Sequence, residues 1–295
     1  MSFLEPDKFV TGSMSDIGKV RSINQDYFGE FEDPRTHRRM LIIADGMGGH
    51  LGGEVASKMA VETVAEIFEA GGNQAAELLR EALETANERV RNAARADAGL
   101  AGMGTTGVCL LFEPGGRGSV AHVGDSRAYR LRAGQLEQIT EDHSVVAVLL
   151  RTGQITEDEA KRHPQRNEVL RAIGTDDQVE VQLTPLELQP GDKYLLCSDG
   201  LSGLVTNADI ADVLRRLDPQ DAARTLVEMA NREGGNDNIT VQVAMIPGVP
   251  TDEKAGAAGV IVTSESDAPA GPSGWLWVAG VGLAGLLLWL LLGSR

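Results

Sequence analysis

The chain is poor in cysteine and in aromatic residues. Its 295 residues include two cysteines, and aromatic residues make up 4%. Neither Cys109 nor Cys197 belongs to a CxxC pair or a Cys/His cluster, which argues against a disulfide framework and against a zinc site. Both lie in apolar runs, so we expect buried free thiols in a reducing compartment.

Positive charge is also scarce. There are 27 Lys and Arg against 43 Asp and Glu, a formal net charge of −16. Such a surface repels a phosphate backbone, so no nucleic-acid partner is expected. The acidity either serves solubility alone or reflects carboxylates that are gathered to hold cations. Hydrophobic residues make up 42%, as in an ordinary globular protein.

One long uncharged run stands near the C-terminus. Residues 275–292, WLWVAGVGLAGLLLWLLL, carry no charge and approach the roughly 20 residues that span a bilayer as a helix. Trp275, Trp277 and Trp289 lie toward its ends, where aromatic belts are found. We expect a single-pass C-terminal membrane anchor rather than a buried core helix. The N-terminal MSFLEPDKFV lacks the basic and apolar segments of a signal peptide.

The preceding segment, residues 247–274, is rich in Pro, Gly, Ala and Ser and is predicted to be a flexible linker. The folded domain is therefore expected at 5–246. Its hydrophobic patterns predict strands at 8–14, 25–31, 39–45, 105–112, 118–124, 127–132, 179–184, 193–198 and 238–246. They predict helices at 51–69, 74–97, 207–216 and 220–232.

Helices that come in pairs between short strands indicate an α+β fold with antiparallel sheets, not a doubly wound parallel sheet. Residues 142–175 are polar and contain only short helical pieces. An insertion of this length is typical of a lid or substrate loop.

Four aspartates lie where apolar strands begin or end, each close to a glycine. LIIAD ends at Asp45, VAHVGD at Asp125 and KYLLCSD at Asp199, while Asp237 precedes the strand ITVQVAMI. A strand end holds a carboxylate rigidly, and a neighbouring glycine lets its own carbonyl approach a ligand.

Any one Asp–Gly pair is more often a turn, but four at strand ends favour a shared site. Carboxylates in one dry site would raise each other's pKa sharply unless cations neutralised them. An all-oxygen set suits Mg²⁺ or Mn²⁺ rather than zinc.

Two other patterns do not fit a ligand site. GMGTTG at 102–107 matches GxGxxG, but it leads from a helix into a strand, the reverse of a dinucleotide site. Close packing at a helix-to-strand junction is the simpler interpretation. The aspartates are also too far apart in sequence for an EF-hand.

The ordered motifs resemble bacterial metal-dependent protein phosphatases of type 2C over residues 8–246. They are RSINQD (21–26), ADGMGGHLGGEVAS (44–57), GTTGV (104–108), AHVGDSRAYR (121–130), EDHS (141–144), RAIG (171–174), LCSDGL (196–201) and GGNDNIT (234–240). The resemblance implies a four-layer αββα sandwich, with two antiparallel β-sheets flanked by pairs of helices. It also implies hydrolysis of phosphoserine and phosphothreonine in proteins.

The resemblance assigns metal ligands for two Mn²⁺ or Mg²⁺ ions and a possible third. Asp45 would bridge the first two ions, and the carbonyl of Gly46 would complete one of them. Asp199 and Asp237 would bind the first ion. Asp125, together with Asp199, resembles the pair that holds a third, weaker ion.

The resemblance also assigns the remaining site residues. Arg21 would bind the substrate phosphate, and His50 would be the general acid. Where the family motif often reads Asn-Glu-Asp, this chain has Gln25 before Asp26. Gln25 supplies no negative ligand, so the second ion is expected to rely on waters held by Asp26. His143 is a candidate to hold the flap, residues 142–175.

The implied partners are proteins phosphorylated on Ser or Thr and a cognate Ser/Thr kinase, and the catalytic domain is expected in the cytoplasm. Two alternatives stay open. One is a non-catalytic signalling or scaffold module of the same fold, which should have lost metal ligands. The other is a hydrolase of small phosphate esters, since the flap is where preference for protein substrates would be set.

Overall fold

The computed structural model describes residues 9–48, 51–72 and 74–247. The predicted membrane span at 275–292 and nearly all of the predicted linker lie outside these ranges. Within them, no helix is both long enough and apolar enough to cross a membrane.

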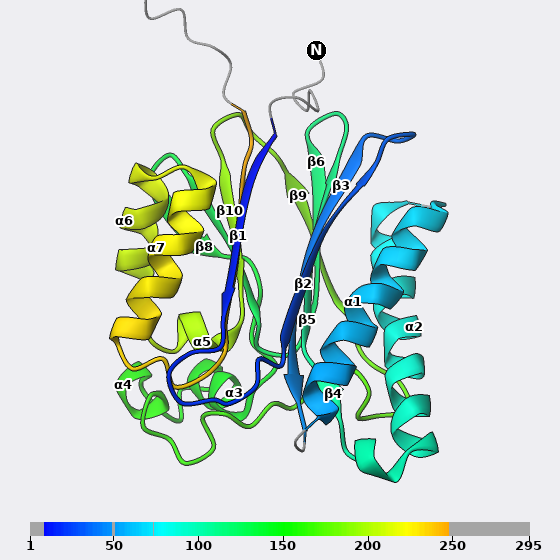
Figure 1. The fold of residues 1–295 in the computed structure, drawn as a ribbon. Coiled ribbons are helices and arrows are strands. Elements are labelled where there is room, and N and C mark those ends of the chain that lie inside the picture. Colours follow the sequence, from blue (N-terminus) through cyan, green and yellow to red (C-terminus); the bar gives the residue numbers. More distant parts are fainter. Residues whose placement is uncertain (1–8, 49–50, 73, 248–295) are drawn as a thin grey trace, which may run out of the picture. The chain divides into compact units, whose positions relative to one another are not determined.

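Two antiparallel sheets form the centre of the folded unit (Figure 1). The first contains, in spatial order, β1 (Val10–Asp16), β11 (Ile239–Met245), β10 (Lys193–Cys197), β7 (Arg127–Arg132) and β8 (Gln135–Gln138). The second contains β2 (Asp26–Asp33), β3 (Arg38–Met47), β5 (Gly107–Glu113), β6 (Arg117–Val123) and β9 (Gln182–Glu187). The short β4 (Gly104–Thr105) pairs with the end of β3.

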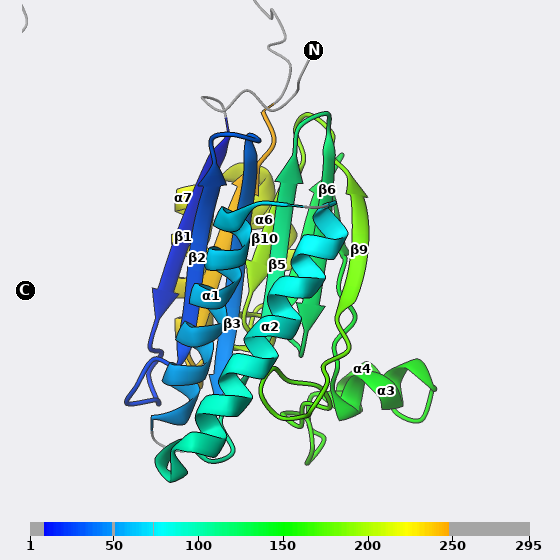
Figure 2. The same ribbon diagram turned by 90° about the vertical axis from the view of Figure 1, so that its right-hand side faces the viewer.

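Helix pairs cover the outer faces of both sheets. The second sheet is covered by α1 (Gly52–Ala70) and α2 (Ala75–Ala96), and the first by α6 (Asn207–Arg216) and α7 (Pro219–Arg232), as Figures 1 and 2 show. Shorter helices are η2 (Ala98–Leu100), α3 (Val145–Arg151), α4 (Glu157–Ala160) and α5 (Asp199–Ser202). The predicted α+β sandwich with two antiparallel sheets is confirmed for the described residues.

The alternation of side chains along β3 explains its continuous apolar run. Met40, Ile42 and Ala44 pack in the cluster that includes α1 and α2. Leu41 and Ile43 belong to the cluster between the two sheets. A strand buried on both faces needs no polar side, so period-two alternation of polarity is absent from LIIA.

The third core cluster lies between the first sheet and the helices α6 and α7. Cys197 belongs to it and Cys109 to the cluster under α1 and α2. Both cysteines are free and buried, as predicted, and burial raises the thiol pKa of each.

Most predicted elements are present within two or three residues of their expected bounds, and α6 matches its prediction of 207–216. Strand β8, QLEQ, is absent from the prediction. The close packing expected for GMGTTG is confirmed, because a Cβ on Gly107 would lie 2.8 Å from Cδ1 of Ile173.

The antiparallel order brings several strand ends to one end of the sandwich. Asp26, at the start of β2, pairs with Asp45 near the end of β3. Cys197, at the end of β10, pairs with Arg127 and Val241. The helices α3 and α4 of the flap lie toward the same end (Figure 1). Aspartates that are distant in sequence therefore meet there.

Candidate metal centre

Asp45 is held by its backbone on two sides. Its N–H donates to Oγ1 of Thr106 at 3.0 Å. Its carbonyl accepts from the N–H of Thr106 at 2.8 Å and from Oγ1 of Thr105 at 2.9 Å. These bonds involve only the backbone of Asp45 and do not use its carboxylate. Oγ1 of Thr106 also lies 2.7 Å from Oγ of Ser126, which connects the Asp45 strand end to the one that carries Asp125.

The carboxylates interact strongly with one another. Burial raises the pKa of Asp45 well above its usual range, and the charges of Asp26, Asp199, Asp125 and Asp237 raise it further. Burial, followed by the charge of Asp237, raises the pKa of Asp199. Burial, followed by the charge of Asp199, raises the pKa of Asp125. Each of the four aspartates predicted to bind metal therefore acts electrostatically on at least one of the others.

Among the described residues, two buried carboxylate oxygens lack a hydrogen-bond partner, Oδ1 of Asp26 and Oδ1 of Asp199. The side chains of Asp45 and Asp199 also contact each other. Adjacent carboxylates with unpartnered buried oxygens need a shared proton or a cation. Hard divalent ions supply that charge and prefer oxygen ligands, so the donor set fits Mn²⁺ or Mg²⁺.

Among the described residues, no group of three or more His, Cys, Asp and Glu side chains is arranged so that it could hold a metal ion. Mg²⁺ usually keeps several waters and needs only one or two carboxylates. Backbone carbonyl oxygens can add to such a shell. The Gly46 carbonyl and waters therefore stay predicted additions to the carboxylates of this site.

Gly46 has no room for a side chain. A Cβ there would lie 2.0 Å from the carbonyl oxygen of Gly53 and 2.6 Å from that of Gln25. The Gly46 N–H donates to the Gln25 carbonyl at 3.1 Å. The side-chain nitrogen of Gln25 lies toward Gly53, where a Cβ would meet it at 2.6 Å. Close contact between the end of β3, the start of α1 and Gln25 thus fixes the Gly46 backbone.

Asp26 joins the two sheets beside the site. Its Oδ2 accepts from Oγ of Ser198 at 2.8 Å and from Oγ1 of Thr240 at 2.7 Å. Its Oδ1 has no protein partner. Oδ2 of Asp26 thus connects the two sheets, and Oδ1 can accept a further hydrogen bond. This is consistent with the predicted role of Asp26 in holding water for an ion.

Arg21 lies beside the carboxylates. Its Nη2 donates to Oδ2 of Asp237 at 2.7 Å. The hydrogen bond to Asp237, followed by the charges of Asp237, Asp45 and Asp199, raises the pKa of Arg21 against the effect of burial. The Arg21 side chain is 48% exposed, so its guanidinium can reach a phosphate that enters from solvent.

Asn238 organises the loop that carries Arg21. Its Nδ2 donates to the carbonyls of Ile17 and Ile23, both at 3.0 Å, and its Oδ1 accepts from the N–H of Gln25 at 2.8 Å. The Asn238 amide group thus bonds, through both its nitrogen and its oxygen, to residues that lie about 215 positions earlier in the sequence. The sequence interpretation missed this residue, although it stands inside GGNDNIT, next to Asp237.

Replacing Asn238 with Asp is expected to lower kcat/KM for a phosphothreonine peptide by about tenfold or more. The loop that carries Arg21 loses two of its hydrogen bonds, and a misplacement of about 1 Å in a substrate-positioning group can cost up to about a hundredfold. The variant loses two donors and adds a carboxylate beside Asp237. Steady-state kinetics would show the loss. Asn207→Asp, which adds the same charge at an exposed position, is the control. Equal activity of the two variants would contradict the positioning role.

Three of the five histidines bear on the predicted site. His50 falls in the pair 49–50, outside the described residues, so its role stays a prediction. His122 is buried and stacks on His143 with ring centroids 4.6 Å apart. His143 Nδ1 accepts from the Gly124 N–H at 3.2 Å, and its Nε2 lies 3.1 Å from Oε1 of Gln182. His143 thus ties the first residues of the flap to the Asp125 strand end.

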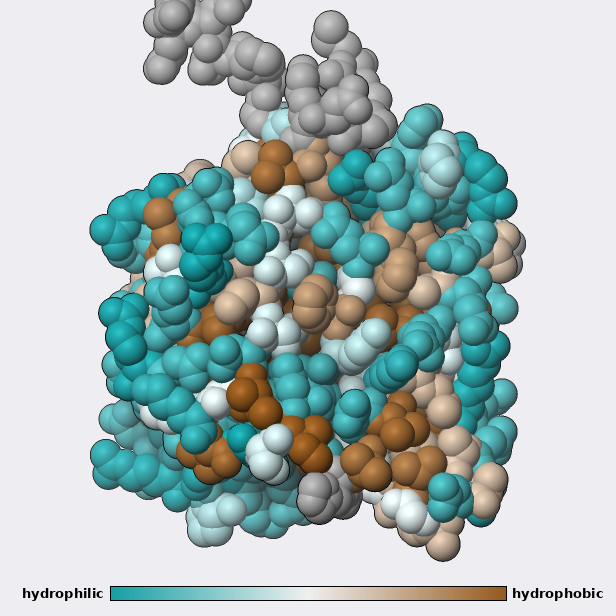
Figure 3. Space-filling view, in the orientation of Figure 1, coloured by the Kyte–Doolittle hydropathy of each residue, from teal (hydrophilic) through white to brown (hydrophobic). Residues whose placement is uncertain are grey.

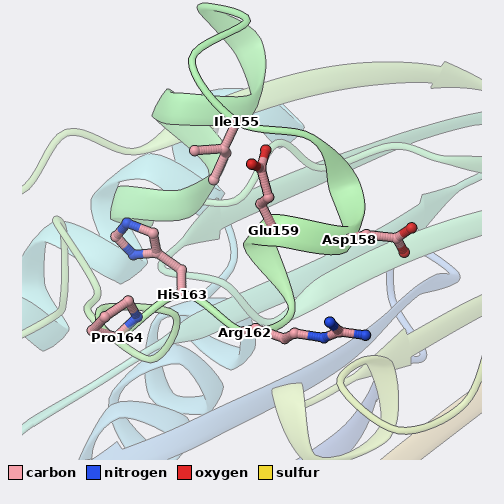
Figure 4. Close-up of a pocket in the computed structure, with 6 residues that line it drawn as sticks. All are labelled: Ile155, Asp158, Glu159, Arg162, His163 and Pro164. Atoms are coloured by element: carbon pink, nitrogen blue, oxygen red, sulfur yellow. The ribbon is translucent and has the colours of Figure 1, made fainter.

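A second contact at the base of the flap involves Asp142. Arg127 donates to both of its carboxylate oxygens, from Nε at 2.9 and 3.0 Å and from Nη2 at 2.7 Å. The flap also contains a pocket of about 380 Å³ (Figure 4). The residues that line it are Ile155, Asp158, Glu159, Arg162, His163 and Pro164. None of these is a predicted site residue.

Residues 19–233 match the family model described as "Protein phosphatase 2C". The chain belongs to the protein phosphatase 2C family. It is 43% identical over 234 residues to the serine/threonine protein phosphatase PstP of Mycobacterium tuberculosis, covering 78% of this chain and 43% of that protein. It is 38% identical over 233 residues to the serine/threonine phosphatase stp of Listeria welshimeri, covering 77% of this chain and 92% of that protein.

Solved structures of the protein phosphatase 2C relatives agree with the fold. The crystal structure of the Mycobacterium tuberculosis phosphatase PstP aligns with a TM-score of 0.74 and 39% identity, covering 81% of this chain and 99% of that chain. The catalytic domain of PstP in complex with two manganese ions aligns with a TM-score of 0.73 and 38% identity, covering 81% and 98%. The chain spans less than half the length of the PstP proteins of Mycobacterium tuberculosis.

Proposed function

We propose that this chain is a metal-dependent serine/threonine protein phosphatase of the PstP and stp type. The observation that carries the proposal is the group of aspartates beside the exposed Arg21, in which Asp26 and Asp199 each have an unpartnered buried oxygen. The proposed metal ligands are Asp45, the Gly46 carbonyl, Asp125, Asp199 and Asp237. Two Mn²⁺ or Mg²⁺ ions are proposed, with Asp125 and Asp199 available for a third.

The residues of the chain divide the work of hydrolysis. Phosphate monoesters hydrolyse extremely slowly without a catalyst. Bound divalent ions lower the pKa of water and neutralise phosphate charge. Arg21 offers a planar fork that matches phosphate oxygens, and its contact with Asp237 supports the proposal that it would hold the phosphate beside the carboxylates. Asp26 orients water through its free oxygen. His50 is proposed to give the leaving serine or threonine oxygen its proton.

The two alternatives lose support for separate reasons. A non-catalytic module has no reason to keep all four aspartates together at a cost in stability, and here each of them is present. A hydrolase of small phosphate esters needs no surface for a protein substrate, whereas this chain has a flap tied to the site through Asp142 and His143.

The test is hydrolysis of a phosphothreonine peptide with Mn²⁺, with excess chelator, and after Mn²⁺ is restored. We expect turnover in the first and third conditions only, and about a thousandfold loss or more in Asp237→Ala, because a metal ion supplies several kcal/mol of transition-state stabilisation. Asp212→Ala, a half-exposed position on α6, is the control. Absence of metal-dependent turnover in the wild type would refute the proposal.

We also propose a division of the chain. Residues 5–246 form the catalytic domain, with the flap at 142–175, and residues 247–274 form a linker to a membrane anchor at 275–292. The catalytic domain lies in the cytoplasm, where phosphorylated substrates and a cognate kinase are present. Protease treatment of intact and lysed cells tests this, since cleavage of the domain in intact cells would contradict it.

A further inference from the structure

Four apolar side chains are exposed at the end of the sandwich where the aspartates meet. The described residues include seven exposed large hydrophobic side chains. Three of these, Val10, Tyr27 and Phe28, lie on the edge strands β1 and β2. The remaining four are Ile17, Val20, Leu51 and Leu170, which are 37%, 67%, 58% and 50% exposed. We call these four the apolar rim.

Val20 is held outward by an anchored loop. The Lys19 N–H donates to the carbonyl of Gly235 at 2.7 Å. Asn238 binds the carbonyls of Ile17 and Ile23 on either side of Val20. The backbone is therefore fixed around the most exposed member of the apolar rim. Since Val20 immediately precedes Arg21, its position is tied to that of the phosphate-binding side chain.

The other members border the same site from different elements. Leu51 is the N-cap of α1, whose first turn contacts Gly46 through Gly53. The Leu170 N–H donates to the His143 carbonyl at 2.7 Å, and the His143 N–H donates to the Gly124 carbonyl at 2.9 Å. The apolar rim thus comes from the β1–β2 loop, the start of α1 and the flap.

Figure 3 shows hydrophobic surface across the lower part of this face, at the end that carries the β1–β2 loop and the start of α1. Exposed apolar patches rimmed by polar residues mark interaction sites more often than scattered single residues do. The net charge of the chain is −16, so acidic residues beside the phosphorylated residue of a partner would be repelled. Exposed apolar side chains near the site therefore favour apolar flanking residues over acidic ones.

We propose that the apolar rim binds apolar side chains next to the phosphorylated residue of the substrate, so that the chain prefers phosphothreonine or phosphoserine in an apolar context. This inference rests on the proposed function. If Arg21 holds the phosphate, the substrate residues next to the phosphorylated one would lie against Val20. Residues farther along the substrate would lie near the elements that carry Leu51 and Leu170. The position of the phosphate therefore favours a segment of the substrate as the partner that covers the apolar rim.

The experiment compares two phosphothreonine peptides of equal length and charge, one with Leu and Val beside the phosphothreonine and one with Ser and Gln. For the wild type we expect kcat/KM to favour the apolar peptide by about tenfold, the size of effect that burial of one or two apolar side chains supplies. Val20→Ser and Leu170→Ser should each reduce that preference by about three- to tenfold, mainly through KM.

Two controls make the result specific. Val10→Ser changes an exposed valine on β1 outside the apolar rim and should keep the wild-type preference. Val20→Ile, which keeps an apolar side chain at position 20, should keep it as well. Hydrolysis of p-nitrophenyl phosphate, which has no flanking residues, should stay unchanged in Val20→Ser and Leu170→Ser. Thermal unfolding checks that each variant is folded.

The proposal would be overturned if the wild type hydrolysed the two peptides equally well, or if both serine variants kept the wild-type preference. In either case, turnover of p-nitrophenyl phosphate would leave the proposed function intact. Failure of the wild type on all three substrates would refute the proposed function itself, and this inference with it. Concentration-dependent dimerisation that Val20→Ser abolishes, with no change in peptide preference, would instead assign the apolar rim to a second copy of the chain.

Discussion

Asp45→Asn is expected to reduce kcat/KM for a phosphothreonine peptide by about a thousandfold or more, since metal ions supply several kcal/mol of the transition-state stabilisation. Asp45 would be one of the residues that hold the proposed ions. An asparagine of the same shape keeps the backbone bonds to Thr105 and Thr106 but removes the negative charge. The loss should therefore be chemical, with the fold retained, and steady-state kinetics at saturating Mn²⁺ would measure it.

The same substitution is expected to stabilise the metal-free protein. Asp45 is partly buried, and burial followed by the charges of Asp26, Asp199, Asp125 and Asp237 raises its pKa, so removing its charge relieves repulsion. A gain of about 1–2 kcal/mol would raise the midpoint of thermal unfolding by roughly 2–8 °C. Asp212→Asn on α6 is the matched control. An Asp45→Asn variant that keeps activity within tenfold, or that unfolds at a lower temperature in chelator, would contradict the metal-binding role.

The metal-free protein is also expected to lose stability as pH rises from about 5 to 8. Burial, the largest cause, raises the pKa of Asp26, Asp45, Asp125 and Asp199, to about 7 for Asp26 and Asp125. A group whose pKa is raised by folding contributes stability below its unfolded pKa. That contribution disappears as pH rises through the folded pKa. Each unit by which folding raises the pKa corresponds to about 1.4 kcal/mol in the free energy of unfolding.

Urea unfolding at pH 5, 6.5 and 8 would measure this effect in excess chelator and in Mn²⁺. With chelator, the free energy of unfolding should fall by several kcal/mol across the range, since several groups contribute about 1.4 kcal/mol per unit each. With Mn²⁺ the fall should be reduced or reversed, because metal binding competes with protons for the same oxygens. Unchanged stability between pH 5 and 8 in chelator would show that the carboxylates are not crowded as described.

Much of the fold could be predicted from local sequence because local rules determine it. Continuous apolar runs such as that of β3 are buried on both faces, and α6 begins at a threonine cap, since Thr206 accepts from the Asp209 N–H. Strand β8 was missed because it is short, polar and at the edge of its sheet. A sequence such as QLEQ carries too little hydrophobic contrast to separate an edge strand from a turn.

The carboxylates of the candidate site could be predicted from the sequence. The hydroxyl and amide side chains that hold them in place could not. Local strand-end patterns indicate Asp45, Asp125, Asp199 and Asp237. No such pattern indicates the hydroxyls that fix the site, because Thr240 reaches Asp26 and Thr106 reaches Ser126 only after the sheets have formed. The three carbonyl and amide contacts of Asn238 likewise depend on tertiary structure. Serine, threonine and asparagine are common on surfaces, so their sequence alone gives no sign of such roles.

The central claim is that strand-end aspartates form one metal site, and isothermal titration of the chelator-treated protein with Mn²⁺ tests it most directly. The wild type is expected to bind at least two Mn²⁺ ions, the number in the manganese complex of the related PstP catalytic domain. Asp45→Asn should lose most of this binding, and Asp212→Asn should keep it. Absence of Mn²⁺ binding by the wild type, or identical binding by Asp45→Asn, would contradict the claim.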